Sequence, residues 1–170
     1  FIQSDKLPIS YLLKMLLITT PPTIILFSLL GLIISINFSI KHANNSIYPL
    51  ILAWFLLPIA IFLLLRPNIY DGIRHLLFIL PALALLSGLG CLHTFAYLNN
   101  RWGSWVASAA LMLAFIFPLI SLIKLHPYQM TYYNFLVGGL EGASERYETD
   151  YWLLSYKEAA QYINKQAQKD

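Results

Sequence analysis

Residues 76–98 read LLFILPALALLSGLGCLHTFAYL and contain no Lys, Arg, Asp or Glu. An α-helix rises about 1.5 Å per residue, so roughly 20 residues cross the hydrocarbon core of a bilayer, which is about 30 Å thick. A charged side chain at the centre of such a helix adds about 2.5–3.5 kcal/mol to the free energy of insertion. The length of the run and its lack of charge therefore predict a transmembrane helix.

Three more runs of the same kind cover residues 16–36, 48–65 and 105–123. Hydrophobic residues make up 58% of the chain and charged residues 11%, and the mean hydropathy is +0.64. These values lie outside the range of soluble domains. We expect an all-α integral membrane protein with about four transmembrane helices. Because no charged residue interrupts a span, a transporter is the least favoured function.

The charge pattern divides the chain into a transmembrane region, 1–125, and a tail, 126–170. The tail carries six acidic and four basic residues, whereas the region before it carries seven basic and two acidic ones. The basic pI of about 9.0 therefore belongs to the membrane region and indicates contact with lipid headgroups, not with nucleic acid. The chain starts at Phe1 without a signal peptide, and we expect it to be part of a longer protein.

Prolines occur within the expected spans, at Pro21, Pro22, Pro58, Pro81 and Pro118. A proline in a helix leaves a backbone carbonyl without its donor, and in membranes a neighbouring helix or a Ser or Thr side chain often supplies one. The spans at 76–98 and 105–123 are joined by the short link NNRWGS. That link predicts an antiparallel helical hairpin.

A polar cluster, RPNIYDGIRH at 66–75, separates the second and third spans. Arg74 and His75 directly precede the third span, and Asp71 lies near the expected N-cap of its helix. The positive end of a helix and the fork of an arginine side chain suit an anionic phosphate, and Arg66 offers a second guanidinium. We predict a lipid-phosphate site at Arg66, Arg74 and His75, supported by Asp71. A solvated loop is the alternative.

The tail begins with HPYQMTYYN, in which the predicted sugar or acceptor pocket comprises His126, Tyr128, Tyr132, Tyr133 and Asn134. If the segment is a helix opened by Pro127, Tyr128 and Tyr132 share one face. An aromatic belt at the membrane interface explains the same tyrosines without a ligand. Because no second ligand lies at suitable spacing from His126, no metal site is predicted.

Further along the tail, Ser155 and Glu158 match the S-x-x-E capping box, and small and apolar residues follow at helical spacing. We expect a short amphipathic helix from Ser155 onward. It either begins a water-exposed domain or lies on the membrane surface.

Two stretches carry a resemblance to a known family. NIYDGIRHLLFILPALALL, and HPYQMTYYNFLVGGLEGASERYETDYWLLSYKEAAQYIN after one more hairpin, resemble the C-terminal part of bacterial membrane glycosyltransferases of the GT-C superfamily. The similar branch is the protein-mannosyltransferase and aminoarabinose-transferase-like family 39. The resemblance covers roughly 66–164, whereas the first 65 residues match only as hydrophobic helices.

The resemblance implies a larger helical bundle that transfers a sugar from a polyprenyl-phosphate carrier at the extracytoplasmic face of a bacterial inner membrane. It implies a position near the carrier phosphate for Arg66, Arg74 and His75. The implied partners are membrane lipids, the polyprenyl-phosphate-linked sugar donor, and the remaining N-terminal part of the protein or other membrane subunits. It implies no intrinsic cofactor, and the need for a divalent metal stays open.

The family's catalytic carboxylate lies in a first extracytoplasmic loop, which has no counterpart in this sequence. Asp5 and Asp71 are the only carboxylates before the tail, and pairing with Arg74 is a better role for Asp71 than that of a general base. A non-catalytic membrane subunit or scaffold is therefore the alternative function.

The orientation in the membrane rests on two opposed indications. Lys6, Lys14, Arg66, Arg74 and Lys124 lie on one side of the membrane if there are four spans, so the positive-inside rule places the polar cluster and tail in the cytoplasm. The resemblance places them outside. We favour the outside, because arginines that hold a lipid phosphate are neutralised by it.

Overall fold

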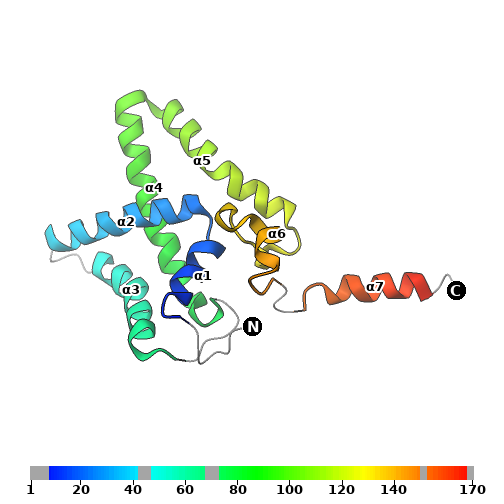
Figure 1. Ribbon diagram of the computed structural model, residues 1–170. Coiled ribbons are helices and arrows are strands. Elements are labelled where there is room, and N and C mark those ends of the chain that lie inside the picture. The colour runs from blue at the N-terminus through cyan, green and yellow to red at the C-terminus, as the bar shows by residue number, and fades with distance from the viewer. Residues whose placement is uncertain (1–7, 42–46, 68–72, 150–152, 168–170) are drawn as a thin grey trace.

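The computed structural model describes residues 8–41, 47–67, 73–149 and 153–167, and every regular element among them is a helix (Figure 1). Four of these helical segments are long and apolar enough to cross a membrane. They are α2 (Pro22–Lys41), α3 (Ile47–Leu65), η2 (Arg74–Ile79) continued by α4 (Leu80–Trp102), and α5 (Ser104–Lys124). The prediction of an all-α membrane protein with about four spanning helices is confirmed.

The first apolar run forms two helices instead of the single span expected at 16–36. The helix α1 (Tyr11–Thr19) ends before Thr20, whose backbone is extended with φ −103° and ψ 137°, and α2 begins at Pro22. Pro21 and Pro22 lack N–H groups, and a residue before proline disfavours the helical conformation. The expectation that both prolines lie inside one spanning helix is therefore wrong. With nine residues, α1 is too short to cross a bilayer.

The main helix–helix contact joins α2 and α4, which cross each other in Figure 1. Gly31 of α2 and Gly90 of α4 lie at this crossing. A Cβ added to Gly31 would lie 1.8 Å from the Leu86 carbonyl oxygen, and one added to Gly90 would lie 2.0 Å from that of Phe27. Each backbone therefore occupies the space of the other's missing side chain. Close approach at small residues is how helices associate in membranes, where the lipid is as apolar as the side chains.

The helices α4 and α5 form the predicted hairpin, with a shorter link than NNRWGS suggested. Gly103 alone separates them, at φ 88° and ψ 164°, a conformation suited to glycine. Pro118 lies inside α5 and leaves the Ala114 carbonyl without an intrahelical donor. Thr23 Oγ1 of α2 donates to that carbonyl at 2.8 Å. The expected repair by a threonine side chain of a neighbouring helix is confirmed at this proline.

The helix α1 is packed on two sides, so it lies between the membrane region and the tail. On one side Leu12 packs with Ile59 of α3 and with Leu76 and Ile79 of η2. On the other side Met15 and Ile18 pack with the tail residues Tyr133 and Ala143. Most of the described core thus gathers around this short helix and the crossing of α2 with α4.

The described tail contains η3 (Gln129–Thr131), η4 (Phe135–Val137), α6 (Gly139–Ser144) and α7 (Tyr156–Ala167). The expected helix after Ser155 is confirmed as α7. Every residue of α7 is exposed, and the helix extends away from the other elements (Figure 1). The condition that HPYQMTYYN forms a helix opened by Pro127 is not met, because η3 contributes only one short turn.

Candidate functional site

Arg74 and His75 form the first residues of η2, the entrance to the third span, as the sequence predicted. Both side chains are exposed. Ile73 is the N-cap of η2 and makes no capping hydrogen bond through its side chain. Asp71, predicted near this cap, lies outside the described residues. Two groups that can donate hydrogen bonds to an anion therefore stand at the end of a span, where lipid headgroups are found.

Arg66 lies directly after the C-terminal end of α3, with its side chain exposed. Its φ is 46°, in the left-handed region, and its N–H donates to the Phe62 carbonyl at 3.0 Å. Glycine is the usual residue at such a helix end. A bulky arginine in this conformation is unusual, because the left-handed region strains a residue that carries a Cβ. Because η2 packs against α3, Arg66 and Arg74 lie at the same ends of adjacent spans.

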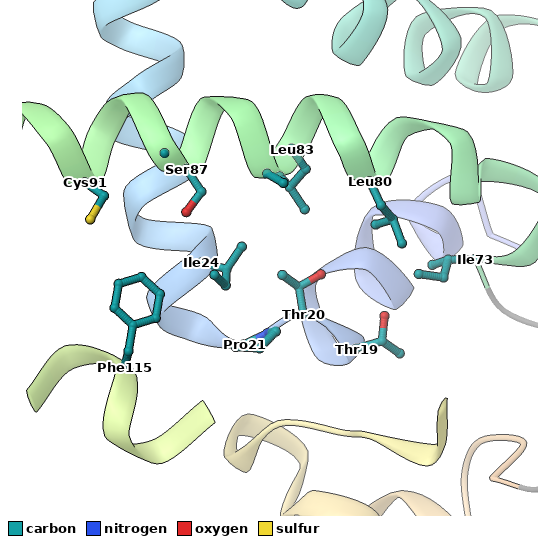
Figure 2. A pocket seen from close by; sticks show the side chains of 12 residues that line it. Thr19, Thr20, Pro21, Ile24, Ile73, Leu80, Leu83, Ser87, Cys91 and Phe115 are labelled. Atoms are coloured by element: carbon teal, nitrogen blue, oxygen red, sulfur yellow. The ribbon is translucent and has the colours of Figure 1, made fainter. Parts of the chain in front are cut away.

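A pocket of about 470 Å³ lies beside the third span and is lined mainly by apolar side chains (Figure 2). The α1–α2 break forms one wall with Thr19, Thr20 and Pro21, and Phe115 of α5 forms another. Figure 2 shows Ser87 and Cys91 of α4 pointing into this space. The remaining lining residues are Ile24, Ile73, Leu80, Leu83, Ala84 and Gly88. Since Ile73 precedes Arg74, the pocket starts beside the predicted phosphate site.

Asn134, predicted to line a sugar pocket, is instead buried against the C-terminal end of α1, with 1% of its surface exposed. Its Nδ2 donates to the Leu17 carbonyl at 2.7 Å and to the Thr20 carbonyl at 2.9 Å, and its backbone N–H donates to the Ile18 carbonyl at 2.9 Å. Its Oδ1 accepts from the Leu136 N–H at 3.0 Å. Both amide hydrogens are thus used within the protein.

Tyr133 is also buried, and its hydroxyl donates to the Glu148 carbonyl at 2.8 Å. Its ring stacks on Tyr147 with centroids 5.8 Å apart, and Lys14 Nζ of α1 lies 5.2 Å from the Tyr147 centroid. Burial, together with smaller contributions from the nearby Tyr11, Glu148 and Tyr147, raises the pKa of Tyr133 to about 12. Burial likewise raises the pKa of Tyr132. This cluster joins the tail to α1.

The five tail residues predicted as one pocket therefore do not have one role. His126 Nδ1 lies 2.9 Å from Gln129 Nε2 in an exposed pair, and the Tyr128 carbonyl accepts from Thr131 Oγ1 at 2.8 Å. Tyr133 and Asn134 face α1. None of the five lines the pocket beside α4, and a ligand role for them stays a prediction.

The residues that line the pocket were not singled out as a site in the sequence. The Pro21–Pro22 pair inside an apolar run marks the helix break that forms one wall. Thr19, Thr20 and Ser87, hydroxyl groups in otherwise apolar runs, are the second indication. Among the described residues, no three His, Cys, Asp or Glu side chains lie close enough to hold a metal ion.

The fold and the site define the class of the protein as a helical membrane protein. Comparison with known protein families, with characterised proteins and with solved structures gives no match for this chain. The resemblance to membrane glycosyltransferases therefore stays a prediction.

Proposed function

We propose that this chain belongs to a membrane enzyme that transfers a sugar from a polyprenyl-phosphate carrier. The observation that carries the proposal is an apolar pocket that begins beside two exposed side chains able to donate hydrogen bonds to a phosphate. Ile73 lines the pocket, and the next residues, Arg74 and His75, are exposed at the end of the span. A lipid with a long hydrocarbon chain and a phosphate head matches this order of apolar and cationic surfaces.

The proposed chemistry assigns Arg74, Arg66 and His75 to the phosphate. When the bond between the sugar and the phosphate breaks, negative charge grows on the phosphate oxygens that leave. Guanidinium groups fixed nearby stabilise this charge more than that of the bound donor, and thereby lower the barrier. The carboxylate that activates the acceptor comes from another part of the enzyme, and the polyprenyl-phosphate-linked sugar is the donor.

The resemblance of residues 66–164 to GT-C enzymes supports the same proposal. It favours the bacterial inner membrane as the location, with the tail on the extracytoplasmic side. When α4 and α5 both cross the membrane, Arg74 and the start of the tail lie on the same side of it, because these two helices separate them. A carrier phosphate at Arg74 is then within the same aqueous compartment as the tail.

The test compares two arginines of the third span. Arg74 lies at its start and Arg101 in its last turn, at the opposite membrane surface. The protein is reconstituted in lipid nanodiscs, and the affinity for undecaprenyl phosphate is measured for Arg74→Ala and Arg101→Ala. A charge-assisted hydrogen bond contributes about 1.5–3 kcal/mol, so we expect Arg74→Ala to lower the affinity at least tenfold. Arg101→Ala is expected to bind like the unaltered protein.

Equal binding by both variants would overturn the carrier site. Sugar transfer from the lipid-linked donor is measured in parallel on the complete enzyme in membranes. We expect Arg74→Ala to lose transfer in proportion to binding, or more strongly if the guanidinium acts mainly in the transition state.

A non-catalytic membrane subunit is the second candidate, and the composition of the pocket favours it. Among the described residues that line the pocket there is no carboxylate and no imidazole, so these residues offer a bound ligand neither of the usual general acids or bases. Trp105 and Phe117 of α5 are 89% and 76% exposed, and offer an apolar surface to further helices. A protein that binds undecaprenyl phosphate but supports no sugar transfer in any assembly would favour this candidate.

A further inference from the structure

The break between α1 and α2 contributes both to the pocket and to the contact with the tail. On one side, Thr19, Thr20 and Pro21 form a wall of the pocket (Figure 2). On the other side, the carbonyls of Leu17, Ile18 and Thr20 accept hydrogen bonds from Asn134. The Thr20 side chain lines the pocket while its carbonyl is held by Asn134. Any displacement of Thr20 therefore changes both the pocket wall and the contact with the tail.

The orientation of α1 depends on these hydrogen bonds, because the helix ladder is interrupted at the break. Thr20 is extended, and the two prolines supply no N–H to the last carbonyls of α1. Asn134 replaces these donors from the tail, more than 110 residues further along the chain. The extended backbone of Thr20 is therefore the point between α1 and α2 at which helical hydrogen bonds are missing.

The tail holds Asn134 in place through its own contacts. Gly139 N–H donates to the Asn134 carbonyl at 3.0 Å, and Leu136 N–H donates to its Oδ1. Tyr133, the residue before Asn134, is itself held by its hydrogen bond to the Glu148 carbonyl and by stacking on Tyr147. We call residues 133–148 the clamp.

We propose that the clamp sets the shape of the pocket, so that seating of the clamp on α1 and occupation of the pocket by a hydrocarbon chain favour each other. Both events involve Thr20, whose side chain lines the pocket and whose carbonyl accepts a hydrogen bond from Asn134. If a filled pocket favours the clamped position of α1, the clamped position must favour filling by the same free energy. The identity of the chain as a polyprenyl carrier rests on the proposed function, whereas the coupling does not.

The coupling extends to the predicted phosphate site through α1. Leu12 of α1 packs on Leu76 and Ile79 of η2, the helix that begins with Arg74 and His75. A shift of α1 therefore alters the support of the arginine as well as the pocket wall. The extramembrane segment thereby acts on both parts of the proposed carrier site.

Cys91 provides a direct readout, because it lines the pocket and is the only cysteine of the chain. The rate of its alkylation by N-ethylmaleimide is measured in nanodiscs for the unaltered protein and for Asn134→Asp. The carboxylate keeps the acceptor for Leu136 N–H but turns an oxygen toward the carbonyls of Leu17 and Thr20. We expect the rate to change at least threefold.

Ser144→Ala is the matched control, because Ser144 is exposed and its Oγ donates only to the nearby Glu141 carbonyl within the clamp. We expect it to be alkylated at the unaltered rate. Asn134→Asp alkylation at that same rate, with helix content preserved, would overturn the proposal. Helix content is measured by circular dichroism on every variant.

A second measurement uses the unaltered sequence, so that it does not depend on the folding of a variant. Cys91 is alkylated with N-dodecylmaleimide, which places a hydrocarbon chain in the pocket, and hydrogen exchange of the clamp amides is compared before and after. We expect exchange of the Asn134 and Gly139 amides to slow severalfold, while exchange in the exposed helix α7 stays the same. Unchanged clamp exchange would contradict the coupling.

The carrier function and the coupling through the clamp can each be contradicted without the other. If undecaprenyl phosphate neither binds nor protects Cys91 from alkylation, the carrier function is wrong, and the two measurements above still decide the clamp. If the lipid binds while both measurements show no coupling, the clamp is wrong and the carrier function stands.

Discussion

Asn134 supplies α1 with the hydrogen bond that Pro21 cannot donate. In an uninterrupted helix the N–H of residue 21 would bond to the Leu17 carbonyl and that of residue 22 to the Ile18 carbonyl. Both positions are proline, and these two carbonyls instead accept from the Asn134 side chain and from its backbone N–H, at 2.7 and 2.9 Å. A residue of the tail thus completes a helix end in the membrane region.

The first prediction is that Asn134 and Pro21 are coupled in stability. Asn134→Ala leaves the carbonyls of Leu17 and Thr20 without their donors, and we expect the free energy of unfolding to fall by about 3 kcal/mol. In a Pro21→Ala background the new N–H can reach Leu17, so Asn134→Ala should be milder there by about 1–2 kcal/mol. Unfolding is followed in detergent micelles for all four proteins of the cycle.

Asn164→Ala is the control for this cycle, because it removes the same side chain from the exposed helix α7. We expect it to change the free energy of unfolding by less than about 0.5 kcal/mol. Additive effects of Asn134→Ala and Pro21→Ala would show that the hydrogen bonds of Asn134 do not replace those that the prolines cannot donate.

The sequence supports a general expectation about prolines but does not identify every donor. The expectation that a threonine of another helix repairs a proline was correct for Pro118, where Thr23 donates to Ala114. At Pro21 and Pro22 the donor comes from a segment interpreted as an aromatic ligand site. Long-range pairing of this kind depends on how the tail folds back on α1, and no local periodicity in HPYQMTYYN records it.

A second prediction concerns the crossing of α2 and α4. Gly31→Ala places a methyl group where the Leu86 carbonyl lies, at 1.8 Å, so the helices must separate. We expect the free energy of unfolding to fall by about 3 kcal/mol. Gly88→Ala in the partner helix α4 is the control, since nothing lies within 4 Å of the added Cβ. It should be neutral or slightly stabilising, because alanine favours helix.

Equal losses at Gly31 and Gly88 would mean that glycine itself, and not the close crossing, is what the helices require. Thermal unfolding midpoints of the two variants, measured in the same detergent, separate these explanations.

The third prediction is a pH dependence caused by Tyr133. Burial raises the pKa of its hydroxyl to about 12, against an ordinary value of about 10. The folded state therefore favours the neutral phenol, and this stabilisation is complete below about pH 10 and is lost as the pH rises to about 12. Between these values the unfolding midpoint of the unaltered protein should fall more steeply than that of Tyr133→Phe.

Tyr162→Phe, at an exposed position of α7, is expected to keep the pH dependence of the unaltered protein. The comparison uses slopes against pH, because Tyr133→Phe also removes the hydrogen bond to the Glu148 carbonyl. Parallel slopes for the unaltered protein and Tyr133→Phe would contradict a buried Tyr133 hydroxyl with a raised pKa.

The spanning helices were predictable because a single physical requirement, apolar length, defines them. The start of the third span at Arg74 and His75 followed from the same requirement, since charged side chains end apolar runs. The pocket was not predictable in this way. Its lining combines α1, α2, α4 and α5, and the break at Thr20 places Thr19, Thr20 and Pro21 in that lining.

The last prediction separates the effect of the Arg66 backbone conformation on stability from the effect of its side chain on lipid binding. A φ of 46° strains any side chain that carries a Cβ, so Arg66→Gly should raise the free energy of unfolding by about 1 kcal/mol. Arg66→Ala keeps the Cβ and should not stabilise. If Arg66 holds the carrier phosphate, both variants lose affinity for undecaprenyl phosphate by about tenfold, although one is more stable than the other. A glycine variant that is more stable and binds the lipid as tightly as the unaltered protein would remove Arg66 from the site.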